Sequence, residues 1–228
     1  PFQRGINCAS ALAVAFRALS WLWILQLVGA RLPAPFVQTL LLSLYRHGLH
    51  LEANLSIYFS PNTHLLGEAV ALHALGALLP QLPRASYWKN YAGAVVRRQM
   101  DVQVQQDGSY FEQSSYYHAY ALDMFLFHAV LEPPDSIYRD KLHKMAAYLN
   151  ALLGPDRHLP FLGDDDGGRF FHPFGRRDRF ARATMATCNA VLTDEWPSIS
   201  ADYQEQAIWW VDCAVQTVAE KSAISEYF

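Results

Sequence analysis

The chain is poor in cysteine and in charge. Its three cysteines, Cys8, Cys188 and Cys213, stand far apart among 228 residues and form no Cys-x-x-Cys pair. This set provides no basis for a disulfide framework or a thiolate zinc site. Charged residues make up only 17% of the sequence, and the formal net charge is −3 at pH 7. Because nucleic-acid-binding domains carry a basic excess, we expect no nucleic-acid partner.

A long uninterrupted hydrophobic run is also missing. The most apolar stretch, Ala9–Val28, contains Arg17 and Gln26, whereas a membrane span prefers about 20 uninterrupted apolar residues. We therefore predict a buried helix there and no membrane span, and we find no targeting segment. Hydrophobic residues make up 52% of the chain, so residues 1–228 are expected to form one soluble domain with a sizeable core.

Alternating strand patterns are almost absent, and helical periodicity runs through nearly the whole chain. Proline and glycine separate the periodic segments, for example at Ser60-Pro61 and Pro133-Pro134, because these residues stop a helix or start the next one. The predicted helices cover residues 8–29, 34–57, 61–79, 84–104, 115–131, 135–153, 179–193 and 200–217. The predicted fold class is therefore all-α.

The predicted helices alternate in polarity. Residues 65–79 and 120–131 are apolar on most faces, as expected of helices buried all round, whereas the helix at 84–104 has a polar face. Odd-numbered helices are thus predicted to be inner and even-numbered ones outer. Such αα-hairpins build an incomplete α/α toroid or barrel, in which the N-termini of the inner helices gather at one mouth.

Two polar stretches begin inner helices. Asn62 and His64 stand at the start of one, and Tyr117 and His118 at the start of another. Unpaired backbone N–H groups and the positive end of the helix dipole favour an anionic ligand at such a position. The long loop at 154–178 precedes a third inner helix, and long ordered loops are often functional. We expect all three segments to meet around one carboxylate-bearing ligand.

Four blocks carry a resemblance to a known family: Asn7–Trp23 with Arg17, Ser60–Glu68, Glu112–His118 and Phe161–Gly168. At these residues the chain resembles the heparinase II/III-like polysaccharide lyases, which share a toroid with the alginate and chondroitin lyases. The resemblance implies a periplasmic or secreted enzyme acting on an acidic polysaccharide. It also implies no cofactor in this domain and a C-terminal β-sandwich domain, absent from this chain, that contributes another catalytic histidine.

The resemblance also implies roles for individual residues. Asn62 and His64 match the family's Asn-His pair and Tyr117 matches the tyrosine of its Tyr-His step, whereas Thr63 departs from the family's Asn-Asn-His form. In a β-elimination, Asn62 and His64 would stabilise the substrate carboxylate while the C5 proton leaves. Tyr117 would act as base and acid if nearby positive groups lower its pKa. The further predicted substrate-binding residues are Trp21, Glu112, Tyr116, His118 and Arg169.

Each of these residues also has an ordinary structural role open to it. An asparagine near a helix start often bonds only to the local backbone, and His64 and Tyr117 could be core residues. Two acidic or histidine clusters suggest metals. Asp164–Asp166 is similar to a calcium loop, but Gly175 stands where such a loop needs glutamate. His47, His50 and Glu52 are more typical of a solvated helix face, so we predict no metal site.

Three classes of function therefore stay open. A polysaccharide lyase accounts best for the Asn62, His64 and Tyr117 set. An inverting glycoside hydrolase would need two carboxylates about 6.5–9.5 Å apart, for which Glu112 and one of Asp164–Asp166 are the sensible pair. A non-catalytic glycan-binding toroid would need none of these groups to react. The products separate the first two, because only a lyase forms an unsaturated sugar that absorbs in the ultraviolet.

Overall fold

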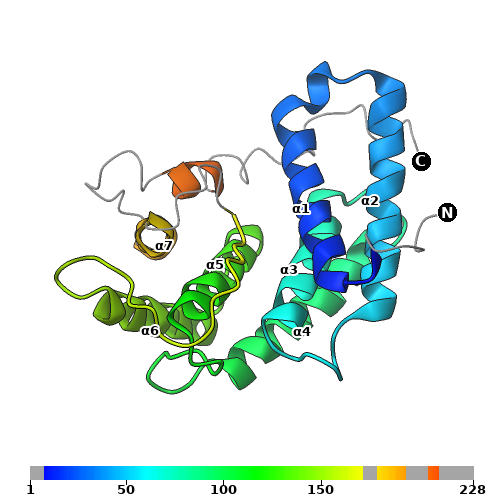
Figure 1. The fold of residues 1–228 in the computed structure, drawn as a ribbon. Helices are drawn as coiled ribbons and strands as arrows, with labels where there is room; N and C mark the ends of the chain where they lie inside the picture. Colours follow the sequence, from blue (N-terminus) through cyan, green and yellow to red (C-terminus); the bar gives the residue numbers. More distant parts are fainter. Residues whose placement is uncertain (1–7, 172–178, 194–204, 211–228) are drawn as a thin grey trace. The chain divides into compact units, whose positions relative to one another are not determined.

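The computed structural model describes residues 8–171, 179–193 and 205–210, and within them the chain is helical (Figure 1). The helices are α1 (Ala11–Val28), the 3₁₀ helix η2 (Gly29–Arg31), α2 (Ala34–Asn54), α3 (Thr63–Leu78), α4 (Ala85–Gln103), α5 (Ser115–Leu131), α6 (Ser136–Leu153) and α7 (Phe180–Leu192). In these residues no β-strand forms, and one isolated bridge joins Val104 to Tyr110. The all-α prediction is confirmed.

The predicted helix bounds agree with the structure to within about three residues, and those of α5 agree at both ends. The predicted C-terminal boundary of α2 is wrong by three residues. The prediction ran to residue 57, and the helix ends at Asn54. In a longer helix the N–H of Ser56 would bond to the carbonyl of Glu52. It donates instead to the Glu68 carboxylate at 2.7 Å. Of the predicted helix 200–217, residues 205–210 are helical and the rest lie outside the described residues.

The chain divides into two compact units. Unit 1 contains residues 1–96 and 216–228, and unit 2 contains residues 97–215. In unit 1, α1 packs against α2 and α3. Gly48 on α2 lets the Trp88 ring approach closely, since a Cβ there would lie 2.3 Å from the ring. The indole N–H of Trp88 donates to Glu52 at 2.7 Å, and Glu52 also pairs with Arg84.

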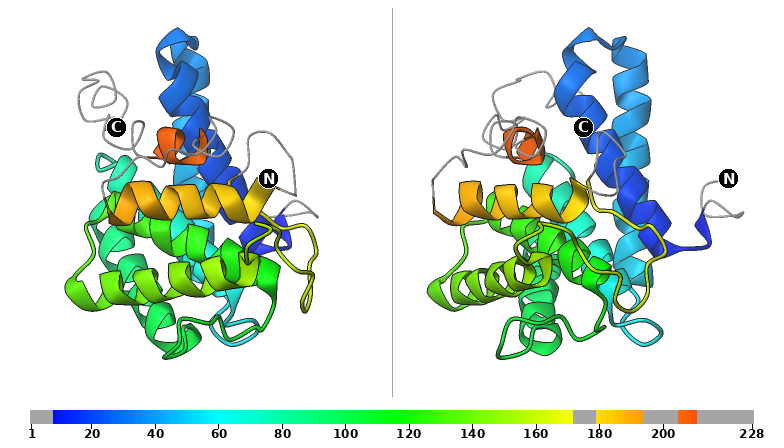
Figure 2. Two further views of the ribbon diagram at one scale, coloured as in Figure 1. Left: turned by 90° about the vertical axis from the view of Figure 1, so that its left-hand side faces the viewer. Right: turned by 60° about the vertical axis from the view of Figure 1, so that its left-hand side comes forward.

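Unit 2 is built around α5. Helices α6 and α7 both pack on it and on each other, and the three helices lie side by side in the left view of Figure 2. Because α5 is apolar on nearly every face, it is buried along most of its length. The turn before α5 packs against α6 through Gly108, where a Cβ would lie 2.3 Å from the carbonyl oxygen of Lys144.

Helix α1 is less buried than predicted. Its N-terminal part buries residues such as Val14 and Leu19, but Ile24 and Leu27 near its end are 41% and 48% exposed. By length and composition, Ala11–Arg31 is one helix able to cross a membrane, with a mean hydropathy of 1.7 and 28% of its apolar window buried. Core helices and signal sequences share these properties. The predicted absence of a membrane span therefore stays an expectation.

The core of unit 2 contains a buried acid. Asp123 on α5 is 0% exposed, and the Gln206 amide donates to one of its carboxylate oxygens at 2.7 Å. Burial raises the pKa of Asp123 to about 8. Its side chain therefore holds a proton at neutral pH in the folded chain, and the unfolded chain releases that proton near pH 4.

We predict that Asp123 contributes stability that is lost as the pH rises from about 4 to 8. In this window the unfolded state loses the Asp123 proton and the folded state keeps it, so a rising pH favours unfolding. Asp123→Asn should remove this contribution, so the slope of stability against pH in urea-unfolding experiments should become more positive across the range. The matched control is Asp101→Asn, whose side chain is 69% exposed and should leave the slope unchanged. The same slope in Asp123→Asn as in the wild-type chain would contradict the assignment.

Candidate functional site

Asn62 and His64 lie at the N-terminus of α3. Asn62 is the N-cap, and its side-chain oxygen accepts the backbone N–H of His64 at 3.0 Å. The Asn62 side chain is half-buried, whereas His64 is exposed. Asn62 therefore caps the helix locally, as an asparagine at a helix start often does. Its amide NH₂ group takes no part in the capping bond. A ligand at this helix end would meet an exposed imidazole at the positive end of the helix dipole.

A buried carboxylate fixes the loop that leads to Asn62. Glu68 on α3 is 0% exposed, and its two oxygens accept the N–H and the hydroxyl of Ser56 at 2.7 and 2.8 Å. Burial raises the pKa of Glu68, and the two Ser56 bonds oppose that rise. Sequence reasoning did not single out Glu68. The available signal was a lone carboxylate in an apolar helical segment, four residues after His64.

The N-terminus of α5 is tied to the loop that follows α6. The Ser114 hydroxyl accepts the N–H of Tyr117 at 3.1 Å and donates to the carbonyl of Asp164 at 2.5 Å. Ser115 adds further bonds to this loop, among them one from its hydroxyl to the Pro160 carbonyl at 2.5 Å and one from its N–H to the Leu162 carbonyl at 3.0 Å. These serines were missed as individual residues, although a serine before a helix is a common cap signal. They bring Asp164 next to Tyr117.

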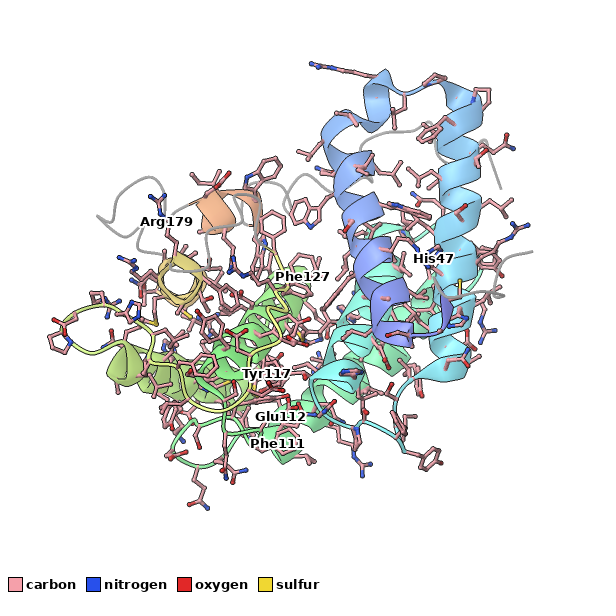
Figure 3. The ribbon with its side chains drawn as sticks, viewed as in Figure 1. His47, Phe111, Glu112, Tyr117, Phe127 and Arg179 are labelled. Carbon is pink, nitrogen blue, oxygen red and sulfur yellow. The ribbon has the colours of Figure 1, made fainter. Side chains whose placement is uncertain are left out.

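Tyr117 lies in an acidic environment. Its hydroxyl donates to the Asp164 carboxylate at 3.4 Å. Burial and the charges of Asp166, Asp164 and Glu112 together raise the pKa of Tyr117 to about 12. Figure 3 shows Glu112 and Tyr117 in the same region of unit 2. We expected positive groups to lower this pKa, and the described neighbours have the opposite charge. The hydroxyl is therefore protonated at neutral pH.

His118 lies in a different environment from Tyr117. Its side chain is 1% exposed and contacts α6, where Nε2 lies 3.0 Å from the carbonyl oxygen of Met145. Its ring centroid is 5.1 Å from that of Tyr148. Burial lowers the pKa of His118 to about 4, so the imidazole is neutral. This burial gives no support to the predicted direct contact with substrate.

Three of the predicted substrate-binding residues pack on neighbouring rings. Tyr116 stacks on Phe180 at 6.3 Å, and the Arg169 guanidinium lies over the same ring at 5.5 Å. In unit 1, Trp21 makes an edge contact with His47 at 4.7 Å. All three are only partly buried, so they combine a packing role with an accessible surface. Of the loop at 154–178, residues 172–178 lie outside the described part.

The predicted solvated face at His47, His50 and Glu52 is wrong. His47 and His50 are 1% and 9% exposed, because α2 packs against α1 and α3 on that side. The His47 Nε2 accepts from Arg17 at 2.9 Å, and burial lowers the pKa of His47 to about 4. Glu52 is held by Arg84 and Trp88.

The acidic loop at Asp164–Asp166 is shaped by its own carboxylates. The carboxylate of Asp164 accepts the N–H of Asp165, that of Asp165 accepts the N–H of Gly167, and that of Asp166 accepts the N–H of Gly168. Each of these distances is 2.8 Å. Across residues 8–171, 179–193 and 205–210, no three His, Cys, Asp or Glu side chains gather in a way that could hold a metal ion. Asn62 and His64 belong to unit 1 and Tyr117 to unit 2, and their meeting around one ligand stays a prediction.

Known proteins share this arrangement of helices. Residues 19–169 match the family model described as Heparinase II/III N-terminus. A heparin-sulfate lyase from Bacteroides stercoris is 30% identical over 146 residues, which are 58% of this chain and 21% of the lyase. Two solved structures of heparinase III, one with methylated lysines, have TM-scores of 0.57 and 0.58 at 24% and 23% identity.

The structural match covers 84% of this chain and confirms the predicted α/α toroid fold. The chain spans only about a fifth of the length of the lyase, 21%, and about a third of the solved heparinase III chains, 31% and 32%. The sequence resemblance at the four blocks is thereby confirmed at the level of the family.

We predict that Glu68 and Ser56 are energetically coupled. Ser56→Ala and Glu68→Gln should each destabilise the chain by about 1–3 kcal/mol, because each leaves a buried polar group poorly paired. In the double variant the two losses should be less than additive by about 0.5 kcal/mol or more, as measured by urea unfolding. Ser86→Ala, at an exposed position of α4, is the control. Fully additive losses would show that the two residues do not act as a pair.

Proposed function

The chain belongs to the heparinase II/III family, and from that premise we propose that it is the helical part of a polysaccharide lyase. The substrate would be a uronic-acid-containing glycan, cleaved by β-elimination. The observation that carries this proposal is the exposed His64 beside the Asn62 cap, at the start of a helix in this family's toroid. That helix end suits a carboxylate, which is the group a uronate presents next to its C5 proton.

The elimination removes the C5 proton, expels the C4 oxygen and leaves a C4–C5 double bond. The C5 proton is poorly acidic while the neighbouring carboxylate is charged, so donors must stabilise the negative charge that builds up on that group. In this proposal the amide NH₂ of Asn62 and the imidazole of His64 supply them, and the positive end of the α3 dipole adds to their effect. The Glu68–Ser56 pair holds the loop that carries Asn62.

Tyr117 is proposed as the group that protonates the departing C4 oxygen. Its hydroxyl is protonated at neutral pH because burial and three carboxylates raise its pKa to about 12, and a protonated phenol is a proton donor. To act as the base as well, Tyr117 would first need a cation close enough to lower its pKa. A histidine from a β-sandwich domain of the longer protein is our proposed base.

The proposal also covers the surroundings of this chain. The relatives are three to five times longer than the part that matches, with 21% to 32% of their length covered. We propose that a β-sandwich domain of the longer protein is the partner of this chain. We also propose that the helical part holds no cofactor and that the protein is periplasmic or secreted. Heparan-type polysaccharides come first among the substrates because the curated relative is a heparin-sulfate lyase.

A hydrolase is the second candidate, and one observation supports it. Glu112 and the Asp164–Asp166 loop both act on the same tyrosine, Tyr117. Two carboxylates around one point are what an inverting glycoside hydrolase needs. Membership of the lyase family favours elimination.

We predict that the longer protein containing this chain releases unsaturated, ultraviolet-absorbing products from a uronate polysaccharide. Tyr117→Phe should lower kcat by about 100-fold or more, because proton transfer to the leaving oxygen is lost. Tyr87→Phe, at a position of α4 that is 48% exposed, is the control and should retain most activity. Reducing ends that appear without absorbance would establish the hydrolase instead, and binding without either product would establish a non-catalytic toroid.

A second variant separates the cap role of Asn62 from its proposed catalytic role. Asn62→Asp keeps an oxygen that caps α3, and a negative charge at a helix N-terminus is favourable. We therefore expect stability to change by no more than about 0.5 kcal/mol. Activity should fall by about 100-fold or more, because the NH₂ donor becomes a charge that repels the substrate carboxylate. An active Asn62→Asp enzyme would reduce Asn62 to a structural cap.

A further inference from the structure

The loop between α2 and α3 in unit 1 (Figure 1) carries two adjacent aromatic rings that are open to solvent. Tyr58 is 97% exposed and Phe59 is 93% exposed. Of the large apolar side chains in the described residues, these two are the most exposed. Almost no protein atom therefore covers either face of these rings. Covering such a ring with an apolar surface is favourable, so the pair indicates a binding surface.

Both ends of this loop are held by hydrogen bonds. At the first end, Ser56 donates its N–H and its hydroxyl to the buried carboxylate of Glu68. At the second end, Asn62 caps α3. Residues 57–61 lie between these two anchors, so the rings stand on a short loop that has few conformations open to it. A ligand that covers the rings therefore loses little conformational entropy in ordering the loop.

The rings lie close to the proposed carboxylate site. Phe59 precedes Asn62 by three residues, so their Cα atoms are at most about 11 Å apart. Residues 55–62 include no charged side chain, so the loop itself offers no ion-pair partner to an acidic ligand. What it offers is the electron-rich face of each ring, which attracts the slightly positive C–H groups of an apolar surface. A pyranose ring presents such a C–H face.

The size of the exposed pair favours a sugar over a protein partner. Two aromatic side chains provide about 300–500 Å² of contact area, whereas a stable protein interface needs about 800 Å² from each partner. A sugar ring can be covered by a single aromatic face. The pair therefore fits a glycan chain better than it fits another protein domain.

We propose that Tyr58 and Phe59 stack against sugar units of the polysaccharide that neighbour the unit whose carboxylate meets Asn62 and His64. This inference rests on the proposed function, because the carboxylate site sets where the glycan lies. The rings contact units away from the bond that breaks. They therefore contribute to binding of the glycan and not to the chemical step.

The test is titration calorimetry on the longer protein with a heparan-type hexasaccharide, in a Tyr117→Phe background that prevents turnover. Replacing both rings by leucine, Tyr58→Leu with Phe59→Leu, should weaken binding by at least about ten-fold, because leucine is apolar but has no flat face. Replacing both by tryptophan should retain the binding. Unchanged affinity in the double leucine variant would overturn the inference and leave the proposed function standing. A longer protein that binds no uronate oligosaccharide would overturn both.

Kinetics of the longer protein with an intact Tyr117 give a second readout. The double leucine variant should raise KM by at least about ten-fold and change kcat by less than about two-fold, since the rings act on binding alone. Phe36→Leu is the matched control. It replaces an aromatic ring that is 52% exposed in the first turn of α2, at the other end of that helix from the loop, and should change neither constant.

A thermal melt decides whether the rings face a glycan or protein. Because both rings are open to solvent, the double leucine variant should melt at the wild-type temperature. A large drop in the melting temperature of the longer protein would show that the rings pack against another of its domains, and would overturn the inference. If the wild-type protein forms no unsaturated product, the lyase proposal fails, and the calorimetric comparison still decides whether the rings bind sugar.

Discussion

The first turn of a helix that is buried on every side is the constraint on which the proposed site depends. Helices α3 and α5 are apolar nearly all round, so each must be enclosed by protein. Their first N–H groups still need partners, because an unpaired buried amide is costly. Asn62 meets that need at α3 and Ser114 at α5. Asn62 and Ser114 therefore each stand where a core helix begins.

Each cap is supported from a distant part of the chain. Glu68 holds the loop before Asn62 through Ser56, and the Ser114 hydroxyl holds Asp164 from the loop after α6. A loop fixed at both ends loses less conformational entropy when a ligand binds. Each of the two helix starts is thus held by a polar contact from a distant residue, 12 positions away in sequence at α3 and 50 at α5.

The charges around Tyr117 decide whether its hydroxyl group keeps its proton at neutral pH. A phenol beside cations is a base, and the same phenol beside Asp164, Asp166 and Glu112 keeps its proton. This environment supports the proposed role as proton donor. In the proposed function, the favourable contacts of an acidic substrate are those with the helix dipole and the exposed imidazole at the start of α3.

Several features followed from the sequence because their causes are local. The bounds of α5 agree with the prediction, since Ser114 and the residues after Leu131 act within a few positions of the helix ends. The all-α class and the resemblance at Asn62, His64 and Tyr117 likewise depend on short patterns. By contrast, the end of α2 was predicted too late, because the partner of Ser56 lies 12 residues away on another helix.

The sequence by itself determined which segments are helices, where they start and which polar residues stand at those starts, because propensity and capping act over one or two turns. Only the tertiary structure decided the protonation of Tyr117, the burial of His47 and His50, and the orientation of His118 toward α6. These depend on burial and on charges brought together by packing, and a pattern of neighbouring residues does not contain them.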